Sequence, residues 1–252
     1  MSRPLILITN DDGYRAPGLL ALRAAVADLG DVVVIAPDHE RSACGQGITI
    51  KGPLTVDRLD DTTYAIDGTP ADCVILALAN LLPKKPDVVL SGINRGANLG
   101  DDVYYSGTVG GAREAAFWGL PAGACSLVTR NKPLDFTEAA RHSRLLCEML
   151  LTAPPTPGVL LNLNVPDGPA SEILGVKVTR QGTRGHASGV SVTKDSRGRS
   201  FYWIAEPFDT WDAADGDDMA AIRAGYVSIT PLGKDTTSHR DLDAITRALA
   251  AK

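Results

Sequence analysis

Two adjacent carboxylates follow the first apolar run of the chain, Leu5 to Thr9, in the segment Asn10-Asp11-Asp12-Gly13. A continuous apolar run is typical of a buried parallel strand, and open parallel sheets bind ligands beyond the carboxyl ends of their strands. Neighbouring strand side chains point to opposite faces, so Asp11 and Asp12 converge only where Gly13 lets the backbone turn. Converging carboxylates call for a divalent cation such as Mg²⁺ or Mn²⁺. A general acid with a raised pKa and a solvated acidic turn remain open as alternatives.

Two further segments follow predicted strands and carry polar groups. Arg41 and Ser42 come after the run Val32 to Ala36, and they offer a guanidinium for an anion and a neutral hydroxyl oxygen. A glycine-rich segment follows the run Val88 to Ser91 and contains Asn94 and Asn98. Their amide groups suit either a metal or a phosphate. The glycine spacing matches neither a Walker loop nor a dinucleotide fingerprint.

The segment Ser106-Gly107-Thr108-Val109-Gly110-Gly111 opens a predicted helix. Unpaired backbone amides and the helix dipole make such a start a site for anions, although a plain N-cap by Ser106 or Thr108 explains the segment taken alone. A cation held by acids beside such a helix start suits a phosphomonoester, because the metal offsets the charge of the phosphoryl oxygens and activates water.

The elements that must position these segments alternate between strands and helices, which predicts an α/β fold with a mainly parallel sheet. Helices are predicted at Ala16 to Leu29, after Thr69-Pro70, from Ser106 or Thr108, at Phe136 to Leu151 and at Asp241 to Ala251, and later strands at Val159 to Val165 and Gly225 to Thr230. The segment from Gly175 to Glu206 predicts an antiparallel hairpin that reaches toward a partner subunit.

Composition limits the classes of function. The 252 residues include 25 Lys and Arg against 30 Asp and Glu, a formal charge of −5, which argues against binding of long nucleic acid. The apolar N-terminal run is too short for a signal peptide or a membrane span. The four cysteines form no Cys-x-x-Cys pair, so we expect reduced thiols, a cytoplasmic protein and no membrane partner.

The combined motifs resemble the SurE survival-protein family. The matching segments are Asn10-Asp11-Asp12-Gly13, Ala36-Pro37-Asp38 with Arg41-Ser42-Ala43, Gly68-Thr69-Pro70-Ala71-Asp72, Ser91-Gly92-Ile93-Asn94-Arg95-Gly96 with Asn98, Tyr105-Ser106-Gly107-Thr108-Val109 and Gly225-Tyr226-Val227-Ser228. The resemblance implies a Rossmann-like three-layer sandwich with a protruding β-hairpin and a swapping C-terminal arm. It implies one domain over residues 1–252, with the core at about 1–170, the hairpin and oligomerisation arm at about 171–252, and a homodimer or homotetramer.

The same resemblance implies a divalent-metal-dependent 5'-nucleotidase that hydrolyses nucleoside 5'-monophosphates, with 3'-nucleotides and polyphosphate as further substrates. The implied ligands of one Mg²⁺ or Mn²⁺ per subunit are Asp11, Asp12, Ser42 and Asn94, of which Asp11 and Asp12 are also the predicted catalytic residues. The implied phosphate contacts are Asn98, Ser106, Gly107 and Thr108. Asp235 and His239 are open candidates for a general acid or base, His239 because histidine titrates near neutrality. The segment that holds them departs from the family pattern, so ordinary surface residues remain the alternative.

The mechanism remains open between direct attack of water on phosphorus and an aspartyl-phosphate route through Asp11 or Asp12. The adjacent acids allow the second route, but the Asp-x-Asp arrangement usual for it is absent. A nucleotide- or polyphosphate-binding sensor without turnover would use the same groups. A dehydrogenase would need a glycine fingerprint after the first strand, where this chain has Asn10-Asp11-Asp12-Gly13.

Overall fold

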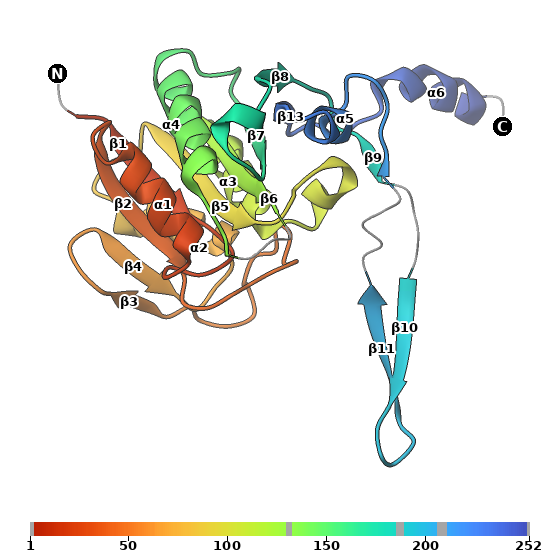
Figure 1. Cartoon of the computed structure of the whole chain (residues 1–252), viewed down its shortest axis with the longest axis horizontal. Helices are drawn as coiled ribbons and strands as arrows, with labels where there is room; N and C mark the ends of the chain where they lie inside the picture. Colours follow the sequence, from red (N-terminus) through yellow and green to blue (C-terminus); the bar gives the residue numbers. More distant parts are fainter. Residues whose placement is uncertain (1–2, 130–132, 185–188, 206–210, 251–252) are drawn as a thin grey trace.

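A nine-stranded sheet forms the middle layer of the molecule, in the order β3-β4-β2-β1-β5-β6-β7-β13-β8 (Figure 1). The structure is a computed structural model that describes residues 3–129, 133–184, 189–205 and 211–250. Across the sheet the strands span Val56–Arg58 (β3), Thr63–Ile66 (β4), Asp31–Pro37 (β2), Leu5–Thr9 (β1), Val88–Arg95 (β5), Ala122–Val128 (β6), Val159–Pro166 (β7), Val227–Gly233 (β13) and Val176–Val178 (β8). The strands from β4 to β7 run parallel, whereas β3 and β13 are antiparallel to their neighbours β4 and β7.

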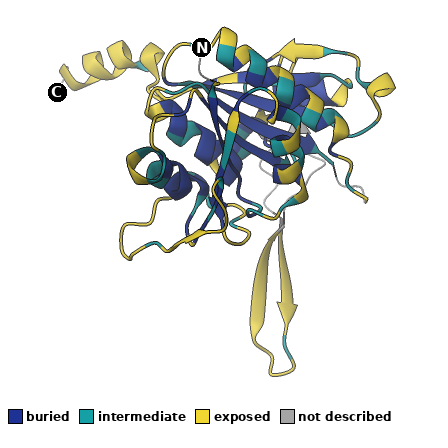
Figure 2. Cartoon of the chain, turned by 90° about the vertical axis from the view of Figure 1, so that its left-hand side faces the viewer, coloured by how far each residue is buried: buried dark blue, intermediate teal, exposed yellow. Residues whose placement is uncertain are grey.

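Helices cover both faces of this sheet, as predicted for an α/β fold. They span Pro17–Val26 (α1), Pro70–Leu76 (α2), Gly107–Phe117 (α3), Thr137–Thr152 (α4), Asp218–Arg223 (α5) and Leu242–Ala250 (α6). Side chains of β1 alternate between the two cores: Ile6 and Ile8 pack with α1 and α4, whereas Leu7 packs with α2 and α3. Each fully buried aliphatic side chain contributes about 1.5–3 kcal/mol. Figure 2 shows the buried residues gathered in the sheet and on the inward faces of the helices.

The helix starts match the sequence signals. Thr69 caps α2 in a capping box with Asp72, and Pro70 takes the first helical position. The Ser106 hydroxyl caps α3 by accepting from the Val109 amide. The first helix ends earlier than predicted, at Val26, because the chain turns back through Gly30 to begin β2. A Cβ atom at Gly30 would lie 2.3 Å from the Pro4 carbonyl oxygen, so only glycine fits that return.

The chain order places a topological switch point beside β1. From β1 the chain builds β2 and β4 on one side and then returns to place β5 on the other side. The connections that leave β1 and β5 therefore diverge at the carboxyl edge of the sheet, where open α/β sheets form their binding crevice. The register between β5 and β6 shifts between Ser91 and Asn94, so the pairing of β5 is irregular just before the predicted Asn94 segment.

The segment after residue 170 contributes two strands to the main sheet and also forms a separate hairpin. Strands β8 and β13 extend the main sheet beyond β7, so part of the predicted arm region belongs to the core sheet. The hairpin of Gly189–Lys194 (β10) and Ser200–Ala205 (β11) projects from the body, and Thr183–Arg184 (β9) pairs with Trp211–Asp212 (β12) at its base (Figure 1). Residues 185–188 and 206 of the predicted hairpin segment, and residues 207–210 after it, lie outside the described part of the chain.

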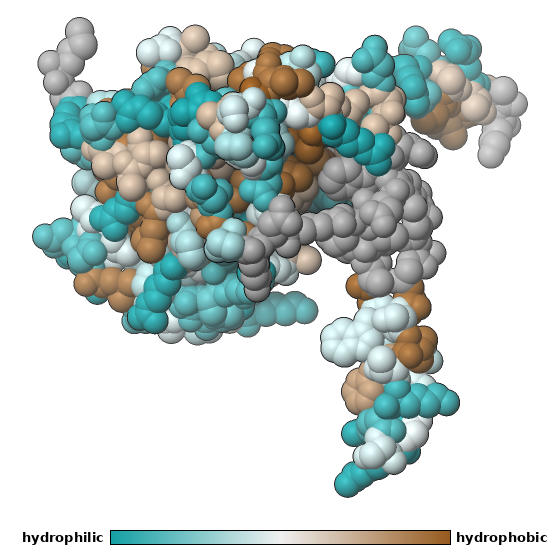
Figure 3. All heavy atoms as spheres, viewed as in Figure 1, coloured by the Kyte–Doolittle hydropathy of each residue, from teal (hydrophilic) through white to brown (hydrophobic). Residues whose placement is uncertain are grey.

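The last helix, α6, stands away from the sheet, and none of its described residues is buried (Figure 2). Apolar side chains are exposed on both projecting elements (Figure 3), and they are Val190, Val192, Phe201, Tyr202, Trp203 and Ile204 on the hairpin and Leu242, Ile245 and Leu249 on α6. Among the described helices, none combines the length and apolarity that crossing a bilayer requires.

Candidate active site

Asp11 lies at the carboxyl end of β1, against the start of α3. Its side chain is buried, and the Thr108 hydroxyl donates a hydrogen bond to Asp11 Oδ1 over 2.5 Å. Burial raises the pKa of Asp11, while the Thr108 hydroxyl and the backbone amides of Thr108 and Gly107 act to lower it. The helix start therefore faces the Asp11 carboxylate and stabilises its ionised form.

Asp12 lies close enough to Asp11 for their charges to interact. Burial raises the pKa of Asp12 to about 6, and the negative charge of Asp11 is the second cause of the rise. The backbone amide of Arg95, at the end of β5, donates to Asp12 Oδ2 over 3.3 Å. The ends of β1 and β5, which border the switch point, thus meet at this carboxylate.

Gly107 makes the close approach of α3 to Asp11 possible. A Cβ atom at this position would lie 2.8 Å from Asp11 Oδ2 and 2.7 Å from Cys44 Sγ. Cys44 was predicted only as a reduced thiol, and the structure places it near Asp11. Burial, and next the charge of Asp11, raise the pKa of Cys44 to about 11, so its thiol stays protonated at neutral pH.

The loop after β2 is tied to the end of β1. The Arg41 amide donates to the Asp11 carbonyl over 2.7 Å, and the Arg41 guanidinium contacts Asp67. Ser42 Oγ donates to Glu40 Oε1 over 2.7 Å, and the charge of Glu40 acts on Asp12. The loop therefore brings the Ser42–Glu40 pair to the edge of the sheet that holds Asp12.

A second acidic group combines residues of this loop with Asp67, which follows β4. Asp38, His39 and Asp67 are exposed and offer three ligand atoms within 4.8 Å of one another. The guanidinium of Arg41 already contacts Asp67, and one of its nitrogens lies 3.7 Å from Asp38 Oδ1. Because Arg41 supplies the positive charge there, this group has less need of a cation than Asp11 and Asp12 do.

The asparagines at the end of β5 and in the loop after it take two different positions. Asn94 is half-buried and donates through its side-chain amide to the Gly96 carbonyl over 3.0 Å. Asn98 is buried, and its side-chain amide donates to Ser126 Oγ over 2.8 Å. The predicted phosphate contact through Asn98 is thus engaged inside the protein in this structure, and its contribution to a phosphate site remains a prediction.

The backbone of Asn98 is held by two asparagines of β7. The Asn164 side chain accepts from the Asn98 amide over 2.9 Å and donates to the Asn98 carbonyl over 3.0 Å, and Asn162 donates to the same carbonyl over 2.8 Å. The sequence signal for this network was an Asn-x-Asn spacing inside an apolar strand, which places both side chains on one face. We had not predicted a role for either residue.

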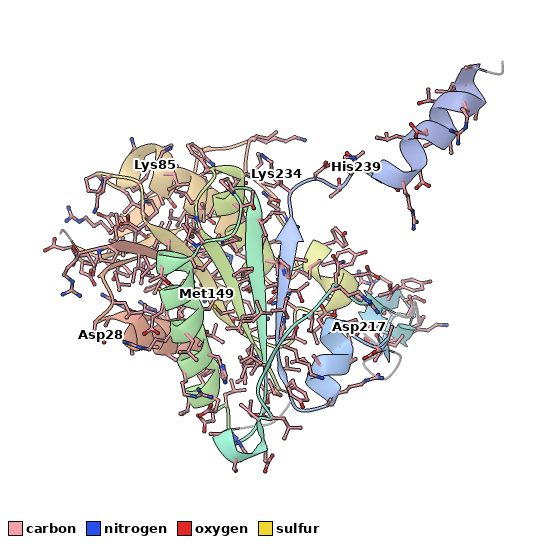
Figure 4. All side chains as sticks on the ribbon, turned by 90° about the horizontal axis from the view of Figure 1, so that it is seen from above. Asp28, Lys85, Met149, Asp217, Lys234 and His239 are labelled. Atoms are coloured by element: carbon pink, nitrogen blue, oxygen red, sulfur yellow. The ribbon has the colours of Figure 1, made fainter. Side chains whose placement is uncertain are left out.

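Asp235 and His239 lie away from this site within the described chain. They pair with each other over 2.8 Å and are exposed. They follow β13, whose last residue, Gly233, pairs with Val159 at the beginning of β7, and thus leave from the amino edge of the parallel strands. Figure 4 shows His239 on the connection to α6, outside the body. The structure does not bring either residue to Asp11.

The donor atoms at the carboxyl edge fit a hard divalent cation. Asp11 and Asp12 are adjacent carboxylates with raised pKa values, and Oδ1 of the preceding residue, Asn10, is buried without a hydrogen-bond partner among the described residues. Oxygen ligands of this kind suit Mg²⁺ and Mn²⁺. By contrast, a cavity of about 440 Å³ lies at the amino edge and is lined by Gly119 to Pro121, Pro154 to Pro157 and Val159. None of these lining residues has an ionisable side chain. We therefore identify the candidate active site by its carboxylates and not by the volume of a cavity.

Known proteins resemble this chain over almost its whole length. The sequence profile described as Survival protein SurE matches residues 6–188. A protein of Pelobacter propionicus named 5'-nucleotidase SurE is 47% identical over 241 residues, which cover 96% of this chain and 98% of the relative. A protein of the same name from Heliobacterium modesticaldum is 47% identical over 239 residues, which cover 93% of this chain and 88% of the relative. The chain belongs to the SurE family.

A solved SurE structure confirms the fold. The crystal structure of the SurE protein from Aquifex aeolicus superposes with a TM-score of 0.87 at 43% identity, and the match covers 97% of this chain and 99% of that chain. The region matched by the SurE profile begins at Ile6 in β1 and includes every predicted metal and phosphate residue, whereas Asp235 and His239 lie beyond it.

Proposed function

We propose that this SurE protein is a divalent-metal-dependent 5'-nucleotidase that hydrolyses nucleoside 5'-monophosphates to a nucleoside and phosphate. The observation that carries the proposal is the pair of Asp11 and Asp12 at the carboxyl edge, with Asp11 held by the start of α3. Curated relatives at 47% identity carry the name 5'-nucleotidase SurE, which supports the same assignment. We extend the proposal to 3'-nucleotides and polyphosphate, as the family resemblance implies.

In this proposal Asp11, Asp12, Ser42 and Asn94 hold one Mg²⁺ or Mn²⁺ per subunit. The support is the fit of the two carboxylates, together with the position of Ser42 on the loop after β2 and of Asn94 near the end of β5. When bound, the cation offsets charge on the phosphoryl oxygens and favours water as the nucleophile. The two neutral oxygens leave the site tolerant of more than one divalent metal.

The start of α3 serves the phosphate side of the site. Ser106 fixes the helix start through its cap on Val109, and Gly107 leaves the space that a side chain would fill. The amides of Gly107 and Thr108 are directed at the Asp11 carboxylate, so a phosphate group would share these donors with Asp11. Asn98 completes the proposed phosphate set, with its loop fixed by Asn162 and Asn164.

Water attacks phosphorus directly in the proposed mechanism, and the rival is a covalent aspartyl phosphate on Asp11 or Asp12. In direct attack, the bond between phosphorus and the ester oxygen breaks as the bond from water oxygen forms, and no bond to the protein is made. Rapid quenching followed by mass spectrometry separates the two routes. A phosphoryl group found on either Asp11 or Asp12 would sink direct attack.

The proposed function is tested by phosphate release from a panel of nucleoside 5'- and 3'-monophosphates and polyphosphate, with Mn²⁺, Mg²⁺ or a chelator. We expect metal-dependent release that Asp11→Asn and Asp12→Asn abolish. Asp61→Asn is the matched control, since the Asp61 side chain is 97% exposed and pairs with Arg58. Activity that survives both substitutions would refute the metal site. Nucleotide binding without release would instead indicate a sensor.

We also propose that the chain forms a homodimer or homotetramer through the hairpin and the C-terminal arm. The support is the set of exposed apolar side chains on both elements, because clusters of this kind mark contact surfaces. Sedimentation of the whole chain tests the assembly. A cytoplasmic location is the matching proposal, since all four cysteine thiols are free and three of them are buried.

A further inference from the structure

The hydrogen bond from Ser42 to Glu40 bears on how the neutral Ser42 hydroxyl could be oriented toward a metal ion. Ser42 Oγ lies 2.7 Å from Glu40 Oε1, and in this pair the hydroxyl is the donor because a carboxylate accepts only. A hydroxyl has one proton and two lone pairs. When the proton is committed to Glu40, both lone pairs remain for other partners.

The backbone holds this pair in place from both sides. On one side the Arg41 amide donates to the Asp11 carbonyl over 2.7 Å, and on the other the Gly45 amide donates to the Tyr105 carbonyl over 2.8 Å. The guanidinium of Arg41 points to a different partner, Asp67, and so leaves Glu40 to Ser42. The short loop from Glu40 to Gly45 is therefore fastened to the end of β1 and to the segment that precedes α3.

Glu40 also acts electrostatically on Asp12. Its negative charge is one of the causes that raise the pKa of Asp12, so the Glu40 carboxylate lies within electrostatic reach of Asp12. Its Oε1 accepts the hydrogen bond of the Ser42 hydroxyl. Glu40 thus contacts one proposed metal ligand, Ser42, and lies near another, Asp12.

We propose that Glu40 is a positioning residue of the metal site, which accepts the Ser42 hydroxyl proton and thereby orients Ser42 Oγ as a ligand for the divalent cation. The inference rests on the proposed function and adds a residue outside the ligand set. Carboxylates that accept a proton from a metal ligand fix the orientation of that ligand and raise its basicity. Without Glu40, the Ser42 hydroxyl would rotate freely and direct its proton toward the cation in part of its conformations.

The test measures the affinity of the metal-free protein for Mn²⁺ alone, by isothermal titration calorimetry. The variants are Glu40→Ala, Glu40→Gln, Ser42→Ala and the double variant of Glu40→Ala with Ser42→Ala. Loss of an outer partner of a metal ligand costs about 10–100-fold in affinity, and we expect a loss in this range for Glu40→Ala. Glu40→Gln keeps an acceptor oxygen and should recover most of the affinity.

The double variant distinguishes two ways in which Glu40 could raise the affinity for Mn²⁺: by orienting the Ser42 hydroxyl, or by its negative charge alone. If Glu40 acts through Ser42, Glu40→Ala costs nothing further once Ser42 is alanine, so the double variant should bind Mn²⁺ as Ser42→Ala does. Full additivity of the two losses, or a loss in Glu40→Gln equal to that in Glu40→Ala, would overturn the proposal, because both results mean that only the charge matters. Glu148→Ala is the control, a carboxylate of α4 that pairs with Arg144.

The outcomes distinguish this inference from the proposed function. Wild-type protein that binds Mn²⁺ and releases phosphate, with Glu40→Ala equal to wild type, overturns the role of Glu40 alone. Wild-type protein that binds no Mn²⁺, or whose binding survives Asp11→Asn with Asp12→Asn, overturns the metal site and the inference together. Circular dichroism of each variant verifies folding, which the exposed positions of Glu40 and Ser42 favour.

Discussion

The carboxyl edge of the sheet differs from the two projecting elements, the hairpin and α6, in which side chains are buried and which are exposed. At the carboxyl edge, Asp11 and Asn98 are buried and paired within the chain, Asp11 with Thr108 and Asn98 with Asn164. On the hairpin and α6, apolar side chains face outward, and Ile204 is 91% exposed. Burial of a polar group costs free energy unless the group is paired, whereas an exposed apolar cluster gains free energy when a partner covers it. Groups of the site are therefore held by contacts within one chain, whereas the projections are suited to contact with other surfaces.

The largest expected effect comes from filling the space at Gly107. A methyl group in Gly107→Ala would lie 2.8 Å from Asp11 Oδ2, so α3 and Asp11 must separate. A displacement on the order of 1 Å in a catalytic site costs about a hundredfold in rate, and we expect this loss in steady-state phosphate release. Gly233→Ala is the control, because a Cβ atom there meets nothing within 4 Å. Equal activities of the two variants would contradict the close contact.

The next effect compares two leucines, one from each region. Leu146 on α4 is 1% exposed, whereas Leu249 on α6 is 68% exposed. Leu146→Ala should lower the free energy of unfolding by about 2–5 kcal/mol in urea denaturation. Leu249→Ala should change it by less than about 0.5 kcal/mol in dilute solution. A large loss for Leu249→Ala that grows with protein concentration would mean that an assembly buries α6.

Asn164→Ala tests the polar network behind the site. The substitution removes a donor to the Asn98 carbonyl and an acceptor of the Asn98 amide, and leaves the amide buried. We expect a loss of about 1–3 kcal/mol in the free energy of unfolding. Asn80→Ala is the matched control on an exposed position. Unchanged stability and unchanged Mn²⁺ affinity in Asn164→Ala would show that the Asn98 loop does not depend on β7.

The smallest effect is a pH dependence that arises from Asp12. The pKa of Asp12 is raised from 3.8 to about 6, so between these values the folded state binds a proton that the unfolded state has released. The free energy of unfolding of the metal-free protein therefore falls as pH rises through this window. With chelator present, Asp12→Asn should remove about 1 kcal/mol of this fall, after allowance for partial solvent exposure.

Thermal melts at a series of pH values measure this difference between wild type and Asp12→Asn. Added Mn²⁺ should stabilise the wild type at neutral pH and have less effect on the variant. Parallel pH curves for the two proteins would show that Asp12 is not the group that titrates.

Local signals predicted much of the fold. The apolar run Leu5 to Thr9 is β1 with the same bounds, and the signals at Thr69 and Ser106 are the N-caps of α2 and α3. These elements follow from nearby residues, because caps and apolar runs act within a few positions. The end of α1 was wrong by three residues, since it depends on the packing of Gly30 against Pro4, which are distant in sequence.

Long-range pairing explains what the sequence could not show about the site. The contact between Asp11 and Thr108 spans 97 positions, and that between Asn98 and Asn164 spans 66. A motif predicts which groups end a strand, but only the strand order shows that the Asn98 loop lies beside β7. The position of His239 likewise depends on the antiparallel direction of β13, which residue types alone do not determine. The metal and phosphate roles stay predictions.

The direction of β13 also has a practical consequence. Because β13 runs opposite to β7, the chain leaves the sheet at the edge where β1 begins, and both ends of the described chain lie on that side (Figure 1). Asp11 and Asp12 follow β1 at the other edge. A fusion tag or a solid support attached through either end would thus sit across the sheet from the two acids, and an immobilised protein would keep the approach to them open to solvent.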